Sequence, residues 1–163
     1  MSKLIAWGIT GAGHFLAGSF SLMENLVKDY DVKITTFLSR AAVETIRIYG
    51  FSAKLCSISD GSYYSEVLRE DEEGPASPTA ARLSKGTYDV LVVSPATANT
   101  VAKIVNGIAD NLVTSAVALA GKGRVPTLIV PTDQETETET TLPPMVDRAV
   151  CRACEPCPPI EKC

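Results

Sequence analysis

The chain has 163 residues, of which 45% are hydrophobic, and its formal net charge at pH 7 is −4. This length is typical of a single domain with one core, and the negative charge excludes the basic surface by which proteins bind nucleic acids. No apolar run approaches the length of a membrane span, and residues 1–5 lack the long apolar region of a signal peptide. We therefore expect a cytoplasmic protein that contacts neither nucleic acid nor membrane.

Apolar strands alternate with helical patterns along the first 131 residues. Strands are expected over residues 4–9, 31–38, 54–58, 88–93 and 125–130, and helices over residues 15–28, 40–50, 101–105 and 111–120. Ser39 and Asp110 stand where the second and fourth helices need a capping residue, and residues 59–86 indicate a short helix and an exposed loop. This alternation predicts an α/β fold with three layers, Rossmann-like or flavodoxin-like, built on a parallel sheet with right-handed crossovers. The pattern leaves the strand order open.

The character of the sequence changes after residue 131. Residues 132–150 are polar and acidic, as in a linker or mobile loop, and residues 151–163 form a cysteine-rich tail. The tail cysteines are Cys151, Cys154, Cys157 and Cys163. The first three have the spacing of a bacterial ferredoxin, but the gap before the fourth is longer. A [4Fe–4S] cluster, structural zinc and no metal are the three interpretations. Cys56 lies in the expected strand 54–58 and is predicted to be buried.

A glycine-rich turn, residues 8–14 with the sequence GITGAGH, joins the first strand to the first helix. Glycines let backbone N–H groups turn toward an anion, and a helix N-terminus attracts negative charge. The turn matches neither the dinucleotide fingerprint nor the P-loop, which favours a mononucleotide. Ser39 and Arg40 follow the second strand. Ser39 either contacts the phosphate of such a mononucleotide or caps its own helix, and Arg40 either contacts that phosphate or faces solvent.

Residues 94–100, with the sequence SPATANT, lie between the strand at 88–93 and the next helix. In an open α/β sheet, ligands bind outside the carboxyl ends of the strands. Pro95 removes a donor and stiffens the turn, and the small side chain of Ala96 lets a flat ring approach the backbone. Asn99 either caps the helix or hydrogen-bonds a ligand through its amide.

Residues 94–111 resemble the Pro-Ala-Ser-Ala-Asn-Thr motif and the segment after it in the flavin-dependent cysteine decarboxylase superfamily, with Thr97 in place of the usual Ser. This superfamily includes flavin prenyltransferases and archaeal flavoproteins similar to dihydromethanopterin reductases. The resemblance covers residues 3–131, and it implies an FMN-binding domain over residues 1–131 that assembles on trimers. The FMN-binding residues it implies are Thr10, Gly11, Ala12, Gly13, His14, Ser39, Arg40, Pro95, Ala96, Thr97, Asn99 and Thr100. Thr10, Gly11 and Ser39 are expected on the phosphate side, and Ala96, Thr97 and Asn99 on the ring side.

The chemistry is expected to differ from that of the decarboxylases, which use a mid-chain His and a C-terminal clamp with Pro, Met and Trp. The only histidine here is His14, in the glycine turn, and no Trp follows residues 143–145. The resemblance therefore implies an FMN-dependent oxidoreductase that takes electrons from a ferredoxin-type donor and reduces a small molecule such as the pterin dihydromethanopterin. A cysteine decarboxylase-type lyase is the alternative. Asn99 and His14 are the catalytic candidates. The helix at residues 112–120 is apolar nearly all round, so it is buried either within the monomer or against a neighbouring subunit.

Overall fold

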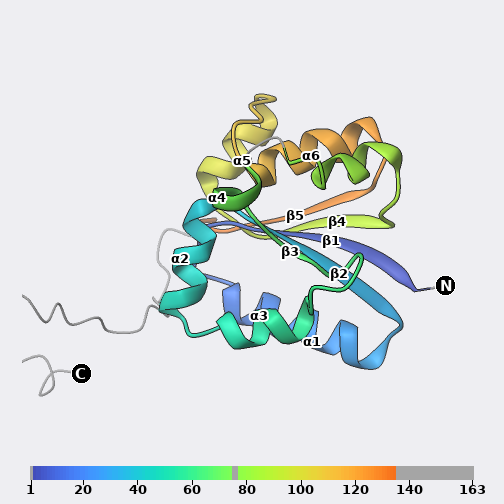
Figure 1. The fold of residues 1–163 in the computed structure, drawn as a ribbon. Coiled ribbons are helices and arrows are strands. Elements are labelled where there is room, and N and C mark those ends of the chain that lie inside the picture. Colours follow the sequence, from blue (N-terminus) through green and yellow to red (C-terminus); the bar gives the residue numbers. More distant parts are fainter. Residues whose placement is uncertain (1, 75–76, 135–163) are drawn as a thin grey trace, which may run out of the picture.

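The computed structural model describes residues 2–74 and 77–134 (Figure 1). Their strands form one sheet in which every pair is parallel, in the order β3-β2-β1-β4-β5. The strands are β1 Lys3–Ile9, β2 Val32–Leu38, β3 Val67–Arg69, β4 Val90–Ala96 and β5 Thr127–Pro131. The parallel α/β sheet predicted from the alternation is confirmed, and the order places β1 and β4 side by side at its centre.

Helices cover both faces of this sheet, so the molecule has three layers (Figure 1). The helices are α1 Leu16–Asp29, α2 Arg40–Ile48, α3 Ser52–Ile58, α4 Glu70–Glu73, α5 Ala98–Val105, α6 Leu112–Lys122 and the 3-10 helix η1 Ala80–Lys85. One face packs against α1, α2 and α3, and the other against α6 and η1. Within the described ranges, no helix combines the length and the apolar character needed to cross a membrane.

Alternate residues of each central strand enter two separate cores. In β1, Ile5, Trp7 and Ile9 pack with the apolar side of α1, whereas Ala6 belongs to the core under α6. This alternation follows from the two-residue period of a strand. A parallel sheet is normally buried on both faces, which is why these strands are almost continuously apolar.

The expected third strand is wrong. Residues 54–58 belong to helix α3, where Leu55 and Ile58 are buried three positions apart on one face of the helix. Cys56 points away from that face and is exposed, contrary to the prediction that it is buried. The third strand is instead β3, which lies within the segment expected to hold only a helix and a loop. It pairs with β2 from Thr36↔Val67 to Leu38↔Arg69.

Two helix starts also differ from the expectation. β4 continues to Ala96, so α5 begins at Ala98 with Thr97 as its capping residue. The cap of α6 is Asn111, whose side chain accepts a hydrogen bond from Thr114 N in a complete capping box. The predicted cap, one residue earlier, is Asp110, which instead pairs with a lysine of α5.

Helix α6 is buried within the monomer. Leu112, Val113, Ala116 and Ala120 join the core between α6 and the sheet, which explains the apolar character noticed in the sequence without a neighbouring subunit. Apolar side chains are exposed elsewhere, at the edge strand β5, where the relative accessibilities of Leu128 and Val130 are 59% and 38%.

Candidate functional site

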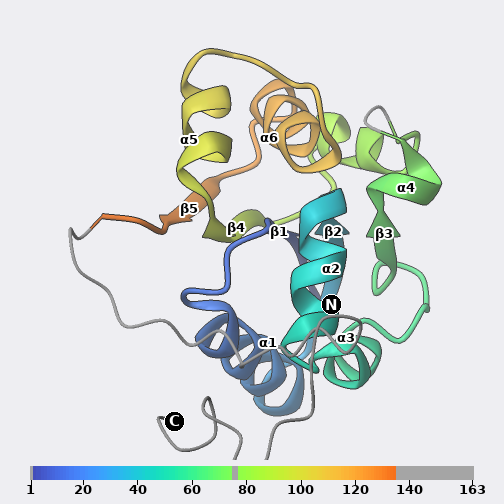
Figure 2. The same ribbon diagram turned by 90° about the vertical axis from the view of Figure 1, so that its left-hand side faces the viewer.

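The carboxyl ends of β1, β2 and β4 lie side by side at the point in the sheet where the crossover connections lead off in opposite directions. From β1 the chain crosses through α1 to β2, and from β4 it crosses through α5 and α6 to β5 on the other side. Such a switch point is where open α/β sheets bind ligands. Figure 2 shows this edge, with the turn after β1, helix α2 and the start of α5 around it. Ser39 N donates to Ile9 O at 3.2 Å and Thr10 N to Pro95 O at 3.2 Å, so the three predicted loops are in direct contact.

The glycines of the turn after β1 allow it to pack closely against α2. A Cβ atom at Gly11 would lie 2.7 Å from the Cβ of Ala41, and one at Gly13 would lie 2.1 Å from the hydroxyl oxygen of Tyr49. Neither glycine has the left-handed backbone conformation that only glycine adopts freely. Space, rather than backbone freedom, is therefore what both positions require, and Ala12 between them is half-buried.

Helix α1 begins without a side-chain cap. Its capping position is Phe15, which has a left-handed backbone with φ 63°, and no acidic residue lies in the first turn. The start of α1 therefore has neither a side-chain cap nor an acidic residue, whereas α2, α5 and α6 each carry a neutral side-chain cap. His14 is half-buried and its ring lies 3.9 Å from that of Phe15. An uncapped helix start is well suited to an anion.

Ser39 confirms its predicted role as the cap of α2. Its side-chain oxygen accepts a hydrogen bond from Ala42 N at 3.2 Å, and its own amide donates to β1. The hydroxyl proton makes no hydrogen bond to the residues that the structure describes, so it can be donated to a ligand. Arg40, the first residue of α2, is exposed beside it.

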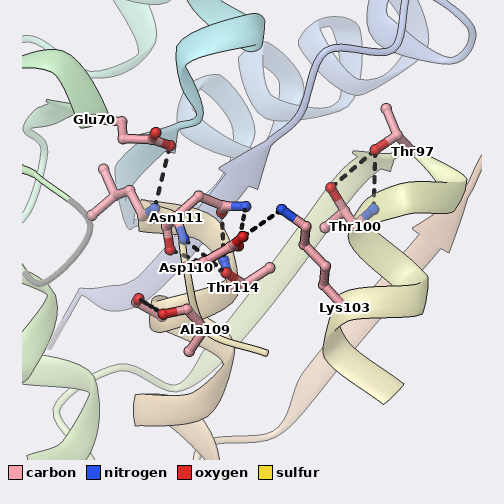
Figure 3. Close-up of polar contacts among 10 residues, drawn as sticks. Glu70, Thr97, Thr100, Lys103, Ala109, Asp110, Asn111 and Thr114 are labelled. Atoms are coloured by element: carbon pink, nitrogen blue, oxygen red, sulfur yellow. Dashed lines mark hydrogen bonds and ion pairs between the residues drawn. The ribbon is translucent and has the colours of Figure 1, made fainter. Parts of the chain in front are cut away.

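The end of β4 is buried, and the turn that follows it is fixed by hydrogen bonds. The Ser94–Pro95 peptide bond is cis, and both residues are buried, as is Ala96. Thr97 accepts a hydrogen bond from Thr100 N at 3.2 Å and shares another with the Thr100 hydroxyl at 2.9 Å (Figure 3).

Asn99 is in the first turn of α5 rather than at its cap. Its side chain is exposed and makes no hydrogen bond within the described ranges. Of the two predicted uses of this amide, capping is wrong and contact with a ligand stays a prediction.

Three side chains that were not among the predicted site residues support this turn. Trp7 Nε1 donates to Ser94 O at 2.8 Å, and the hydroxyls of Ser19 and Ser94 share a hydrogen bond of 2.8 Å. Thr10, a predicted ligand contact, donates from its hydroxyl to Pro95 O at 2.8 Å. These contacts join β1 and α1 to β4, and only the strand order brings them together.

A second group of polar contacts ties α5 to α6 (Figure 3). Lys103 of α5 lies 2.7 Å from Asp110, and this hydrogen-bonded cation holds the pKa of the Asp110 carboxyl below its usual range. Beyond Asn111, the carboxylate of Glu70, the first residue of α4, accepts a hydrogen bond of 3.4 Å from Leu112 N. The last turn of α5 is therefore tied to the segment just before α6, and the first residue of α6 is tied to α4.

The predicted metal ligands lie outside the described residues. Cys151, Cys154, Cys157 and Cys163 all belong to the segment after residue 134. In residues 2–74 and 77–134, no three His, Cys, Asp or Glu side chains are grouped as metal ligands would be. The cysteine cluster therefore stays a prediction from spacing.

The sequence profile of the Flavoprotein family matches residues 1–142. The chain belongs to this family. The chain is thus a flavoprotein-family member, as the motif at residues 94–111 predicted.

Two similar proteins carry the name dihydromethanopterin reductase (acceptor). That of Methanosarcina mazei is 49% identical over 160 residues, which are 98% of this chain and 67% of the relative. That of Methanocaldococcus jannaschii is 51% identical over 155 residues, which are 94% of this chain and 63% of the relative. The chain thus spans about two thirds of the length of these curated relatives.

A solved structure with the same fold contains FMN. It is DmrB of Burkholderia xenovorans in complex with FMN, described as a cubic protein cage for redox transfer. The TM-score is 0.68 with 33% sequence identity, and the match covers 82% of this chain and 68% of DmrB. The Rossmann-like fold predicted from the sequence is confirmed by this likeness.

Proposed function

We propose that the chain is an FMN-dependent oxidoreductase of the dihydromethanopterin reductase type, with its FMN-binding domain over residues 1–131. The observation that carries the proposal is the convergence of the loops after β1, β2 and β4 at the switch point, beside a helix start that lacks a cap. The two reductases at about half identity and the FMN complex of DmrB support the same function.

The site offers donors that suit a phosphate and a surface that suits a flat ring. We assign the phosphate side to Gly11, Ala12, Gly13, His14 and Ser39. Here the Ser39 hydroxyl has a proton to donate and the first turn of α1 provides a positive dipole. Arg40, exposed at the start of α2, adds a cation for the dianionic phosphate.

The ring side is the turn after β4. The small side chains of Pro95 and Ala96 are buried, and Thr97 with Thr100 fixes the first turn of α5. This leaves the Asn99 amide exposed to hydrogen-bond the edge of the ring, so that Asn99 orients the cofactor. When bound, FMN would accept electrons singly or in pairs and pass them on as a pair.

The electron path we propose begins at the tail. Cys151, Cys154, Cys157 and Cys163 would hold a [4Fe–4S] centre beyond a linker at residues 132–150, and a ferredoxin-type donor would supply electrons one at a time. Two electrons, with two protons from solvent, would reduce one double bond of a pterin such as dihydromethanopterin. His14, the only histidine of the chain, is half-buried in the turn after β1 and is, with Asn99, the candidate to contact the substrate.

Cofactor content tests this proposal directly. After purification without oxygen, chromatography of the released ligand should identify FMN, and reduced ferredoxin should bleach the flavin faster than NADH or NADPH. Recovery of a dinucleotide, or of no flavin after reconstitution, would contradict the flavin site. Release of CO2 from a peptidyl cysteine without pterin reduction would favour the lyase instead.

Variants separate the parts of the site. Asn99→Leu should weaken FMN binding and distort the flavin spectrum, whereas Asn106→Leu should leave both unchanged, because Asn106 is exposed at the opposite end of α5. Cys151→Ser with Cys154→Ser should keep FMN bound and slow its reduction by ferredoxin. An unchanged rate of ferredoxin-driven reduction would assign the cysteines another role, such as zinc binding.

We also propose a cytoplasmic homo-oligomer built on trimers. Leu128 and Val130 are exposed on the side of the sheet that faces α1, since Leu128 is paired with Val92 of that core. Parallel sheets are normally covered on both faces, and DmrB is described as a cage. Light scattering should give a mass that is a multiple of the trimer. Leu128→Glu with Val130→Glu should lower this mass, and Leu22→Glu, at an exposed leucine of α1, should not.

A further inference from the structure

Thr10 joins the turn after β1 to the turn after β4 by three hydrogen bonds. Its hydroxyl donates to Pro95 O at 2.8 Å and accepts from Thr97 N at 2.9 Å, and its amide donates to Pro95 O at 3.2 Å. The residue is only 2% exposed. The bonds link the residue directly after β1 to the end of β4 and to the residue that follows it. The two strands are far apart in the sequence and neighbours in the sheet.

The hydrogen-bonding capacity of this side chain decides what else it can bind. A hydroxyl has one proton to donate and two lone pairs to accept with. The proton of Thr10 is used by Pro95 O, and its backbone N–H is used by the same carbonyl. The oxygens of a phosphate dianion can only accept hydrogen bonds, so neither donor of Thr10 is left for them.

Ser39 provides the contrast. Its oxygen accepts from Ala42 N, but its hydroxyl proton has no partner among the described residues. A phosphate at this edge would therefore find a donor at Ser39 and none at Thr10.

We propose that Thr10 is a positioning residue that locks the two turns together, and that it does not contact the phosphate. This inference rests on the proposed FMN site, and it revises the phosphate-side role predicted for Thr10 from the sequence. Because Thr10 also occupies the amide of Thr97, it fixes the capping residue of α5 and so the position from which Asn99 projects.

The consequence is a site that is formed before the ligand arrives. A ligand that contacts both the phosphate loop and the ring-side turn gains affinity when the two are already in register, because binding then orders fewer groups. Losing the lock should also displace the ring-side turn and Asn99, so it should weaken the binding of a flavin with or without the phosphate. Losing a phosphate contact should weaken only a ligand that carries the phosphate.

Two substitutions at residue 10 and two ligands test this. Thr10→Val keeps the shape and removes the hydroxyl, and Thr10→Ser keeps the hydroxyl. Kd values would be measured for FMN and for riboflavin, which lacks the phosphate, with Ser39→Ala as the matched phosphate-side variant. Amide exchange at Thr97 in the flavin-free protein gives a readout that needs no ligand.

Thr10→Val should raise the Kd of riboflavin as well as that of FMN, each by about tenfold, and should shift the flavin spectrum. Thr10→Ser should change neither the Kd values nor the spectrum. Thr10→Val should also speed exchange of the Thr97 amide. Loss of FMN affinity alone, the pattern expected of Ser39→Ala, would overturn the inference. If Thr10→Val does not fold, amide exchange in the wild-type protein tests the inference instead. A Thr97 amide that exchanges at the rate of an unstructured peptide would overturn the inference. If no flavin binds, the proposed function fails, but the exchange rate of the Thr97 amide still tests whether Thr10 holds the two turns together.

Discussion

Replacing Gly13 with alanine tests whether the turn after β1 is shaped by its contact with α2. A Cβ atom there would lie 2.1 Å from the hydroxyl oxygen of Tyr49, 2.6 Å from Cζ and 2.9 Å from Cε2. These atoms belong to a rigid ring that stacks on Phe51 at 6.5 Å, so the ring or the turn must move. Overpacking of this kind costs about 1–3 kcal/mol, and loss of glycine flexibility in the unfolded chain returns about 0.4–1 kcal/mol.

We expect Gly13→Ala to lower the free energy of unfolding by about 1–2 kcal/mol, measured by urea denaturation of the flavin-free protein. Flavin affinity should fall as well, since the turn is displaced. Gly18→Ala is the matched control, because Gly18 is exposed in α1 and nothing lies within 4 Å of its added Cβ. It should stabilise the protein by about 0.5–1 kcal/mol.

A double-mutant cycle identifies the contact responsible. In a Tyr49→Ala background the added methyl at residue 13 meets no ring, so Gly13→Ala should no longer destabilise. Tyr49→Phe should restore only part of the loss, because Cζ remains at 2.6 Å. The reasoning is refuted if Gly13→Ala proves as stable as Gly18→Ala, or if the loss persists without the Tyr49 ring.

Three further substitutions test the surroundings of the site. Trp7→Phe leaves the buried Ser94 carbonyl without its indole donor and should cost about 1–3 kcal/mol of unfolding free energy; an unchanged urea midpoint would show that this bond is not needed. Asn111→Ala removes the cap of α6 and should cost about 0.5–2 kcal/mol in thermal unfolding, more than Asp110→Ala, and the reverse order would mean that Asp110 is the cap after all. Burial raises the pKa of the Tyr88 phenol above its ordinary value, so the folded state keeps this proton longer than the unfolded state. The stabilisation that the protonated Tyr88 phenol gives the folded state is complete below about pH 10 and is lost as the pH rises further. Tyr88→Phe should therefore reduce the fall of stability between about pH 9 and 11, and an identical fall in the variant would assign it to another group.

The long apolar segments were predictable, and the short ones were not. β1, β2 and β5 lie within one or two residues of their predicted bounds, because each is rich in apolar and β-branched residues over a strand-like length. Residues 54–58 are too few to distinguish a strand period from a helix period. β3 has three residues and exists through its pairing with β2, which is a non-local contact.

Within the site, local chemistry was predictable and long-range partners were not. The cap at Ser39 follows from its place before a helix, and the structure confirms it. Asp110 and Asn111 are both good capping residues, and the choice between them was decided by Lys103, which pairs with Asp110. The link from Trp7 to Ser94 depends on β1 lying beside β4, and alternation of strands and helices does not determine strand order.

At the turn after β4, the residues that support the turn are different from the residue that faces outward. Trp7, Thr10 and Ser19 hold the turn from β1 and α1, all buried, whereas Asn99 is exposed on α5 and supports nothing else among the described residues. A substitution at Asn99 therefore changes what the turn presents at its surface without changing how the turn is built. Such a division makes the fold easy to reuse in evolution, since new activities need only a few exposed positions to vary while the buried scaffold stays the same.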